Sequence, residues 1–180
     1  MKKFRLLAAA MAIGVSLAGV LAAAPAVVHA QNVGSGQTGG SVAFVRDAGS
    51  AGHFEVQGAR LALERSQNVG VRGYATQTLK DATEMVNRVK FINEANVSAP
   101  MPRGPNDTQQ ATLNRLAGLS GPDFDREYMR SQIEVSDYLA KTFRAYGANG
   151  ESPTLRVYAA KAVTDYEGQL VRARTVAGSL

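Results

Sequence analysis

The chain has 180 residues, contains no cysteine, and carries 20 lysine and arginine residues against 15 aspartate and glutamate residues. The absence of cysteine excludes disulfides, thiolate metal sites, c-type haem attachment and thiol nucleophiles. Three of the basic residues, Lys2, Lys3 and Arg5, stand at the N-terminus, so the rest of the chain is close to neutral. This balance predicts no nucleic-acid binding.

The N-terminus has the organisation of a secretory signal peptide. Its basic start is followed by an apolar run over residues 6–24 and by the small-residue cleavage pattern Val28-His29-Ala30. We therefore expect residues 1–30 to be a signal peptide cleaved after Ala30, and the mature protein to be periplasmic or secreted, without stable membrane insertion. A retained membrane anchor is the alternative, because the apolar run is almost long enough to span a bilayer.

Residues 31–40 are polar and rich in glycine, which predicts a flexible linker. Residues 41–180 are long enough for one domain with its own core. Within this domain, the sequence VRGYATQTLKDAT of residues 71–83 returns as LRVYAAKAVTDYE at residues 155–167. The repetition predicts a helical hairpin used twice. The shared residues are Arg72, Tyr74, Ala75 and Asp81 in the first copy and Arg156, Tyr158, Ala159 and Asp165 in the second.

Apolar residues recur at three- and four-residue spacings along four long segments, which predicts four amphipathic helices. Gly49 and Gly52 disfavour helix by roughly 1 kcal/mol each, so a start nearer Ser50 is the alternative for the first helix. Asn68 and Ser152 are the predicted caps of the second and fourth helices. The four helices are expected at Ser41 to Gln67, Val69 to about Ala95, Pro122 to about Tyr146 and Pro153 to about Val176.

The segment between the second and third long helices begins with the proline-rich residues 97–106, which exclude regular structure. Asp107 and Gln110 have the spacing of a capping box, and a short helix is expected from Thr108 to Leu119. No stretch shows sustained two-residue alternation, so no sheet is expected. The predicted fold is all-α, an antiparallel four-helix bundle made of two helical hairpins and a short connecting helix.

Polar residues interrupt or border the inward faces of these helices at Glu55, Asp81, Ser136 and Gln169. Because a buried carboxylate needs a partner, we interpret Glu55 as paired with an arginine or a tyrosine hydroxyl. The alternative is that Glu55 is a ligand or a proton acceptor. Asp81 is interpreted as solvated or salt-bridged. Four tyrosines are interpreted as core residues whose hydroxyl groups satisfy buried polar groups: Tyr74, Tyr128, Tyr158 and Tyr166.

Several motifs resemble those of a bacterial family of exported helical bundles called domain of unknown function 4142. The most distinctive is Leu-Ser-Gly-x-x-Phe-Asp-x-x-Tyr at residues 119–128. The resemblance covers Phe44 to Ala173 and implies a ferritin-like architecture, with no activity established for the family. Further matching residues are Phe44, Glu55-Val56, Leu61-Ala62, Val71-Arg72, Tyr74-Ala75, Asp81, Gln132 and Tyr158-Ala159.

The chain departs from this family at three inward positions. Family members typically carry histidines where this chain has Ala82, Ser136 and Gln169. With a glutamate equivalent to Glu55, such histidines would suit a divalent transition metal. The resemblance therefore implies that this chain has lost the family site or binds metal far more weakly, and we expect no metal or cofactor. His53 is only two residues from Glu55, projects from a different side of the helix and does not replace the missing ligands.

No nucleotide-binding or hydrolase motif is present, and the single histidine beyond the predicted signal peptide argues against a catalytic triad. We therefore expect a non-enzymatic, exported bundle with a binding or envelope role and an unidentified protein or small-molecule partner. One alternative is a ferritin-like metal-binding or redox protein that uses Glu55, Asp81 and Gln169. Another is a small-ligand carrier with a cavity lined by Ala59, Ala75, Ala82 and Ala162.

Overall fold

The computed structural model describes residues 40–180, which form five α-helices. The predicted signal peptide and all of the predicted linker except Gly40 lie outside the described residues. Within residues 40–180, no helix combines the length and the apolar composition that crossing a membrane requires. The helices are α1 at Ser41–Arg65, α2 at Val69–Asn96, α3 at Asp107–Ala117, α4 at Gly121–Asn149 and α5 at Pro153–Ala177.

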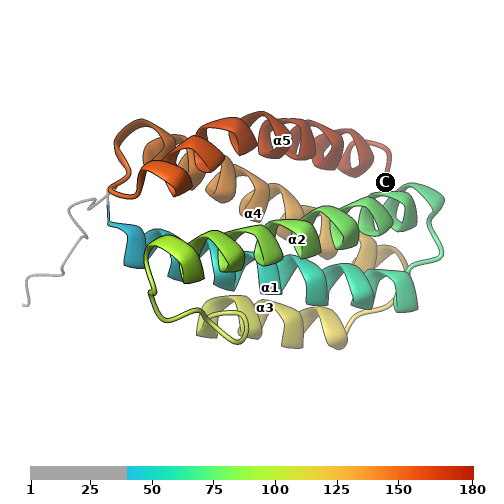
Figure 1. Cartoon of the computed structure of the whole chain (residues 1–180). Coiled ribbons are helices and arrows are strands. Elements are labelled where there is room, and N and C mark those ends of the chain that lie inside the picture. The colour runs from blue at the N-terminus through green and yellow to red at the C-terminus, as the bar shows by residue number, and fades with distance from the viewer. Residues whose placement is uncertain (1–39) are drawn as a thin grey trace, which may run out of the picture. The chain divides into compact units, whose positions relative to one another are not determined.

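Two antiparallel hairpins, α1 with α2 and α4 with α5, pack against each other (Figure 1). α1 lies beside α4 and α2 lies beside α5, so α1 and α5 stand at opposite corners of the bundle. Phe44, near the start of α1, stacks on Tyr146, near the end of α4, with ring centroids 4.1 Å apart. Thr154, at the start of α5, donates a hydrogen bond to Asn96 at the end of α2. These contacts confirm the predicted antiparallel four-helix bundle.

The connection from α2 to α4 runs the length of the bundle, because α2 ends beside the start of α5 whereas α4 begins at the other end. The side chain of Asn93 bonds the backbone N–H and C=O groups of Ala99 and turns the chain out of α2. α3 lies within the connection and packs against α1 and α4. One long crossover is the connectivity of ferritin-like folds.

Glycines misled the prediction of helix ends at two places, and a close helix–helix approach explains each. α1 begins at Ser41, as its expected range has it, rather than at the alternative start near Ser50, and its Gly52 is buried against α2, where a Cβ atom would collide with the side chains of Met85 and Val86. α4 continues past Tyr146 to Asn149, and a Cβ at its Gly147 would lie 2.8 Å from the backbone of Ala160 in α5. At both positions tight packing outweighs the weak helix propensity of glycine.

The predicted caps are correct for α2 and α5 and one residue out for α3. Asn68 accepts hydrogen bonds from the backbone of Gly70 and Val71, and Ser152 accepts one from Leu155. The capping box of α3 is formed by Asn106 with Gln109 rather than by Asp107 with Gln110. The backbone of Asn106 is extended, as an N-cap requires, and Asp107 is already the first helical residue.

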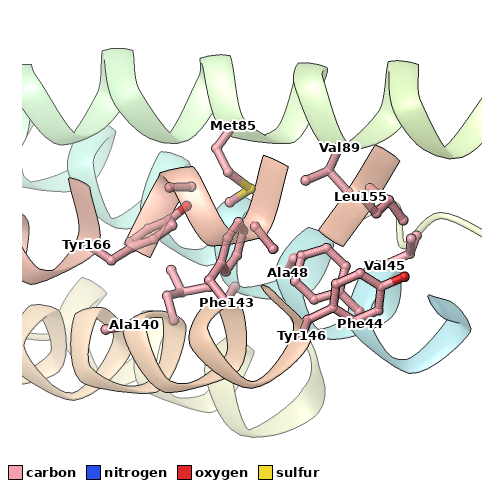
Figure 2. Packing of buried hydrophobic residues seen from close by; sticks show 14 of the residues in the cluster. Phe44, Val45, Ala48, Met85, Val89, Ala140, Phe143, Tyr146, Leu155 and Tyr166 are labelled. Carbon is pink, nitrogen blue, oxygen red and sulfur yellow. The ribbon is translucent and has the colours of Figure 1, made fainter. Parts of the chain in front are cut away.

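The buried side chains form two apolar clusters, one toward each end of the bundle. The first holds the aromatic contacts of Phe44 with Phe143 and Tyr146, which lie close to Val45, Ala48 and Leu155 (Figure 2). The second cluster is built around Val71, Phe124 and Tyr128. Along each long helix the two clusters are separated by buried polar positions, and these polar positions meet at the middle of the bundle.

Candidate functional site

A layer of buried polar side chains crosses the middle of the bundle between the two apolar clusters. Every one of the four long helices contributes to it, and all of its members are at most 5% exposed. Because each of the four helices places at least one buried polar residue in it, the layer is not a single isolated polar group. We call it the central polar layer; it consists of Glu55 from α1, Tyr74 and Thr78 from α2, Tyr128, Gln132 and Ser136 from α4, and Gln169 from α5.

Glu55 and Gln169 join opposite corners of the bundle. The side-chain amide Nε2 of Gln169 donates a hydrogen bond to Oε1 of Glu55, and both side chains are buried. The interpretation of Glu55 as the partner of an arginine or a tyrosine hydroxyl is therefore wrong. The partner is a neutral amide, which can stabilise a carboxyl group by a hydrogen bond but brings no compensating charge.

Most of the other polar atoms in the layer form no hydrogen bond with residues 40–180. Such buried atoms are uncommon in folded proteins, where the large majority of polar groups have a partner. The layer is consequently rich in donors and acceptors that the protein itself leaves unused. These atoms are Glu55 Oε2, the hydroxyl oxygens of Tyr74, Tyr128 and Ser136, and both amide atoms of Gln132.

The electrostatics of the layer keep Glu55 in its protonated form near neutral pH. Burial is the largest cause and raises the pKa of Glu55 to about 8, because removal from water disfavours the charged carboxylate. The hydrogen bond from Gln169 lowers the pKa, and the negative charge of Asp81 raises it. Glu55 is thus a buried neutral acid rather than a standing negative charge.

Three of the four tyrosines predicted as core residues, Tyr74, Tyr128 and Tyr166, are buried, whereas Tyr158 is only partly buried. The prediction that their hydroxyl groups satisfy buried polar groups is wrong for Tyr74 and Tyr128. Burial, followed by the charge of Glu55, raises the pKa of Tyr74, whereas the nearby Ser136 and Gln169 lower it. Burial also raises the pKa of Tyr128 and of Tyr166 well above the ordinary value. Their hydroxyl groups therefore remain uncharged at physiological pH, and those of Tyr74 and Tyr128 lack hydrogen-bond partners within residues 40–180.

A cleft of about 980 Å³ opens on the bundle surface between α2 and α5. Gln169 belongs both to its wall and to the central polar layer, so the cleft reaches down to the hydrogen bond with Glu55. The wall combines charged, amide and aromatic groups. Its lining residues come from α2 and α5 alone and include Asp81, Ala82, Glu84, Arg88, Phe91, Tyr158, Ala162, Asp165, Tyr166 and Arg172.

Asp81 lies in this cleft and is salt-bridged, in agreement with its interpretation from sequence. Its carboxylate is 3.8 Å from the guanidinium of Arg172 across the cleft and accepts a 2.7 Å hydrogen bond from Gln77. Of the four alanines expected to line a ligand cavity, Ala82 and Ala162 do so. Ala59 and Ala75 are fully buried in the second apolar cluster and do not reach the cleft.

The residues present do not fit a transition-metal centre of the kind that the family resemblance implies. Ser136 and Gln169 lie in the central polar layer with Glu55, and Ala82 lines the cleft beside Gln169. Metal binding requires deprotonated ligands, but the only acid of the layer is held protonated and bonded to an amide N–H group. In the part of the chain that the structure describes, no three histidine, cysteine, aspartate or glutamate residues form a cluster suited to a metal ion.

His53 stands apart from the layer. Its Nε2 atom lies 3.2 Å from the carbonyl oxygen of Pro102, so the ring bonds the crossover that leaves α2. The most important residues that sequence reasoning missed are Arg88 and Arg172. The sequence did contain a pattern that points to them. When both copies of the repeat are extended by five residues, Arg88 and Arg172 occupy equivalent positions, each seven residues after the shared aspartate.

Comparison with curated proteins finds no match to this chain. Two solved structures share the fold. CopM in the Cu(II)-bound form has a TM-score of 0.66 at 15% sequence identity, with 78% of this chain and 97% of that chain covered. The conserved hypothetical protein Rv2844 from Mycobacterium tuberculosis has a TM-score of 0.60 at 20% identity, with 78% and 92% covered. At these identities the likeness shows a common helical fold.

The family assignment comes from the sequence profile rather than from these two structures. The profile named domain of unknown function (DUF4142) matches residues 26–176, which include all four long helices up to the last turn of α5. The match contains the 119–128 motif at the start of α4 and the polar positions Glu55 and Gln169. This chain therefore belongs to the DUF4142 family.

Proposed function

We propose that the protein is an exported, non-catalytic binding protein that carries a small polar molecule in the cleft between α2 and α5. The observation that supports this proposal best is the cleft itself, which is large enough for a metabolite-sized ligand. Its wall carries both signs of charge and three aromatic rings, and it ends at the buried Gln169. Because most of the lining residues are polar or charged, the cleft suits a polar ligand better than an apolar one.

The positions of His53 and Glu55 support binding rather than turnover. General acid–base catalysis needs a titrating group within reach of the substrate. His53 is bonded to the Pro102 carbonyl outside the cleft. Glu55 titrates near neutral pH, but it is fully buried behind Gln169 and bonded to it. The export part of the proposal depends on the signal-peptide pattern of residues 1–30.

A pair of neighbouring substitutions tests the cleft. Glu84 lines it, whereas the adjacent Thr83 is exposed on α2 and does not line it. We would screen the mature wild-type protein by ligand-observed NMR against a defined panel of sugars, polyols, carboxylates, amines and amino acids. Compounds that bind the wild type should lose binding to Glu84→Trp, which fills the cleft, and keep it with Thr83→Trp. A panel without any binder, or binders that tolerate Glu84→Trp, would refute the proposal.

The second candidate function is metal binding, and one observation favours it: the fold is shared with a protein whose structure contains Cu(II). The donor set of the central polar layer speaks against it, since Ala82, Ser136 and Gln169 supply no imidazole. Metal analysis of the mature protein, purified from the periplasm without chelators or a histidine tag, separates the two candidates. A stoichiometric transition metal would replace the carrier proposal by the metal-binding one.

A further inference from the structure

The charged residues of the cleft occur as two pairs related by the internal repeat. The repeat matches Asp81 of α2 with Asp165 of α5, and the same alignment matches Arg88 with Arg172. Because α2 and α5 are antiparallel, the repeat relates the contact of Asp81 with Arg172 to a contact of Asp165 with Arg88. The fold thus offers the cleft two equivalent cross-helix ion pairs.

Only one of the two pairs is formed. Asp81 and Arg172 approach to 3.8 Å. Among the ion pairs and side-chain hydrogen bonds within residues 40–180, none involves Arg88 or Asp165, although both line the same cleft. In one half of the cleft, the charges of Asp81 and Arg172 are therefore paired with each other. In the other half, the guanidinium of Arg88 and the carboxylate of Asp165 have no ion-pair partner within residues 40–180.

These two available charges stand near one hydroxyl group. The positive charge of Arg88 lowers the pKa of Tyr158 and the negative charge of Asp165 raises it, on top of the burial that brings this pKa to about 12. Arg88 comes from α2, and Asp165 lies on α5 two turns after Tyr158. The two charges thus lie on opposite walls of the cleft, and Tyr158 of α5 lines the same cleft.

Apolar side chains also line the cleft, beside polar groups that include Glu84 and Asn87. Phe91, one turn after Arg88 on α2, lines the cleft and is 67% exposed. Met85 and Ala162 also line the cleft. A guanidinium binds carboxylates through paired N–H donors, and a carboxylate binds ammonium groups. A small molecule carrying both charges and an apolar body would match all three features.

We propose that the cleft binds a small zwitterion of the amino-acid class, with its carboxylate on Arg88, its ammonium group on Asp165 and its apolar part against Phe91. This inference rests on the proposed carrier function and names its ligand class. The two opposite charges of the ligand complete the second ion pair in place of a direct contact between the helices.

Three probes that differ only in charge test the inference on the mature protein. L-Phenylalanine carries both charges, phenethylamine only the ammonium group, and 3-phenylpropionate only the carboxylate. By titration followed by NMR, the zwitterion should bind at least about tenfold more tightly than either single-charge probe. Equal affinity for all three, or no binding of L-phenylalanine, would overturn the inference.

Substitutions then assign each charge. Arg88→Gln should weaken L-phenylalanine and 3-phenylpropionate by about tenfold and leave phenethylamine unchanged. Asp165→Asn should weaken L-phenylalanine and phenethylamine and leave 3-phenylpropionate unchanged. The matched control is Arg174→Gln, which removes an exposed arginine of α5 that does not line the cleft and should change no affinity more than about twofold. Equal losses in Arg88→Gln and Arg174→Gln would also overturn the assignment.

The outcome separates this inference from the carrier proposal. If other members of the panel bind in a way that Glu84→Trp abolishes, but zwitterions do not, the cleft carries a different polar ligand and only the zwitterion inference fails. If no panel compound binds the cleft, both fail.

Discussion

Gln169 donates a hydrogen bond to Glu55 between two helices that are not neighbours, and this contact closes the centre of the bundle. Both side chains are almost completely buried, at 4% and 0% exposure. A neutral amide at this place leaves the charge of the carboxylate uncompensated, so the proton stays on Glu55 up to a pH of about 8.

The stability of the protein should therefore fall as the pH rises. An unfolded glutamate has a pKa of about 4.5, so between about pH 4.5 and 8 the folded state holds a proton that the unfolded state has released. Stability is unaffected by this group below that window and is lost progressively across it. Glu55→Gln cannot titrate, so its melting temperature should decline less. From pH 5 to pH 8 the wild type should lose roughly 10 °C relative to Glu55→Gln.

The control for this comparison is Glu64→Gln, which removes an exposed glutamate from the same helix. Its melting temperature should follow that of the wild type at every pH. Parallel curves for the wild type and Glu55→Gln would show that Glu55 is ionised in the folded protein.

The close contact of α1 with α2 makes Gly52 sensitive to the smallest enlargement. Gly52→Ala places a methyl group against Met85 and Val86 and should lower the free energy of unfolding by roughly 1–3 kcal/mol. Gly73→Ala in α2 provides the opposite case, because nothing lies within 4 Å of its new Cβ. It should raise stability by up to about 1 kcal/mol through helix propensity alone. Urea denaturation measures both, and equal effects would contradict the assigned packing.

Asn93 should be important for the turn that leaves α2. Its buried amide bonds both the N–H and the C=O group of Ala99, and Asn93→Ala leaves these two backbone groups without partners. We expect a loss of about 1–3 kcal/mol in unfolding free energy. Asn87→Ala, six residues earlier at an exposed position, should change stability by less than about 0.5 kcal/mol. Similar losses for the two variants would show that the Asn93 contacts contribute little.

Introducing histidines at positions 82, 136 and 169 tests whether these positions converge on a metal site, as the family resemblance implies. The combined variant with Ala82→His, Ser136→His and Gln169→His should bind Cu(II) or Zn(II), because imidazoles would then replace a methyl, a hydroxyl and an amide near Glu55. Its melting temperature should rise when metal is added, whereas that of the wild type should not. Metal analysis after gel filtration gives the stoichiometry. A folded triple variant without bound metal would show that the three positions do not converge.

The fold was largely predictable because it follows from local patterns. The repeated segment predicted two hairpins, and capping residues such as Asn68 and Ser152 placed helix starts to the residue. Helix propensity misled at Gly52, for the alternative start of α1, and at Gly147, for the end of α4, because a neighbouring helix decides the outcome at both places. Helix propensity describes an isolated helix. It therefore does not account for a glycine whose missing side chain allows a neighbouring helix to pack closely.

The candidate site was only partly predictable. Glu55 and Gln169 were recognised as polar interruptions of apolar faces, but their mutual contact was not, because they belong to helices that are far apart in the sequence. Arg88 escaped notice because charged residues on helices are ordinarily solvated. The cleft that makes it interesting exists only where α2 and α5 come together.

The first helix of the bundle depends on the last hairpin for its completion. The hydroxyl of Ser41 bonds that of Tyr146 at 2.7 Å, and its backbone N–H group donates to Glu151 at 3.1 Å. A chain made from its N-terminus therefore presents the start of α1 long before the residues that cover it exist. Until synthesis has passed residue 151, the apolar face around Phe44 stays uncovered, and the nascent protein is most exposed to aggregation and to chaperones during that interval.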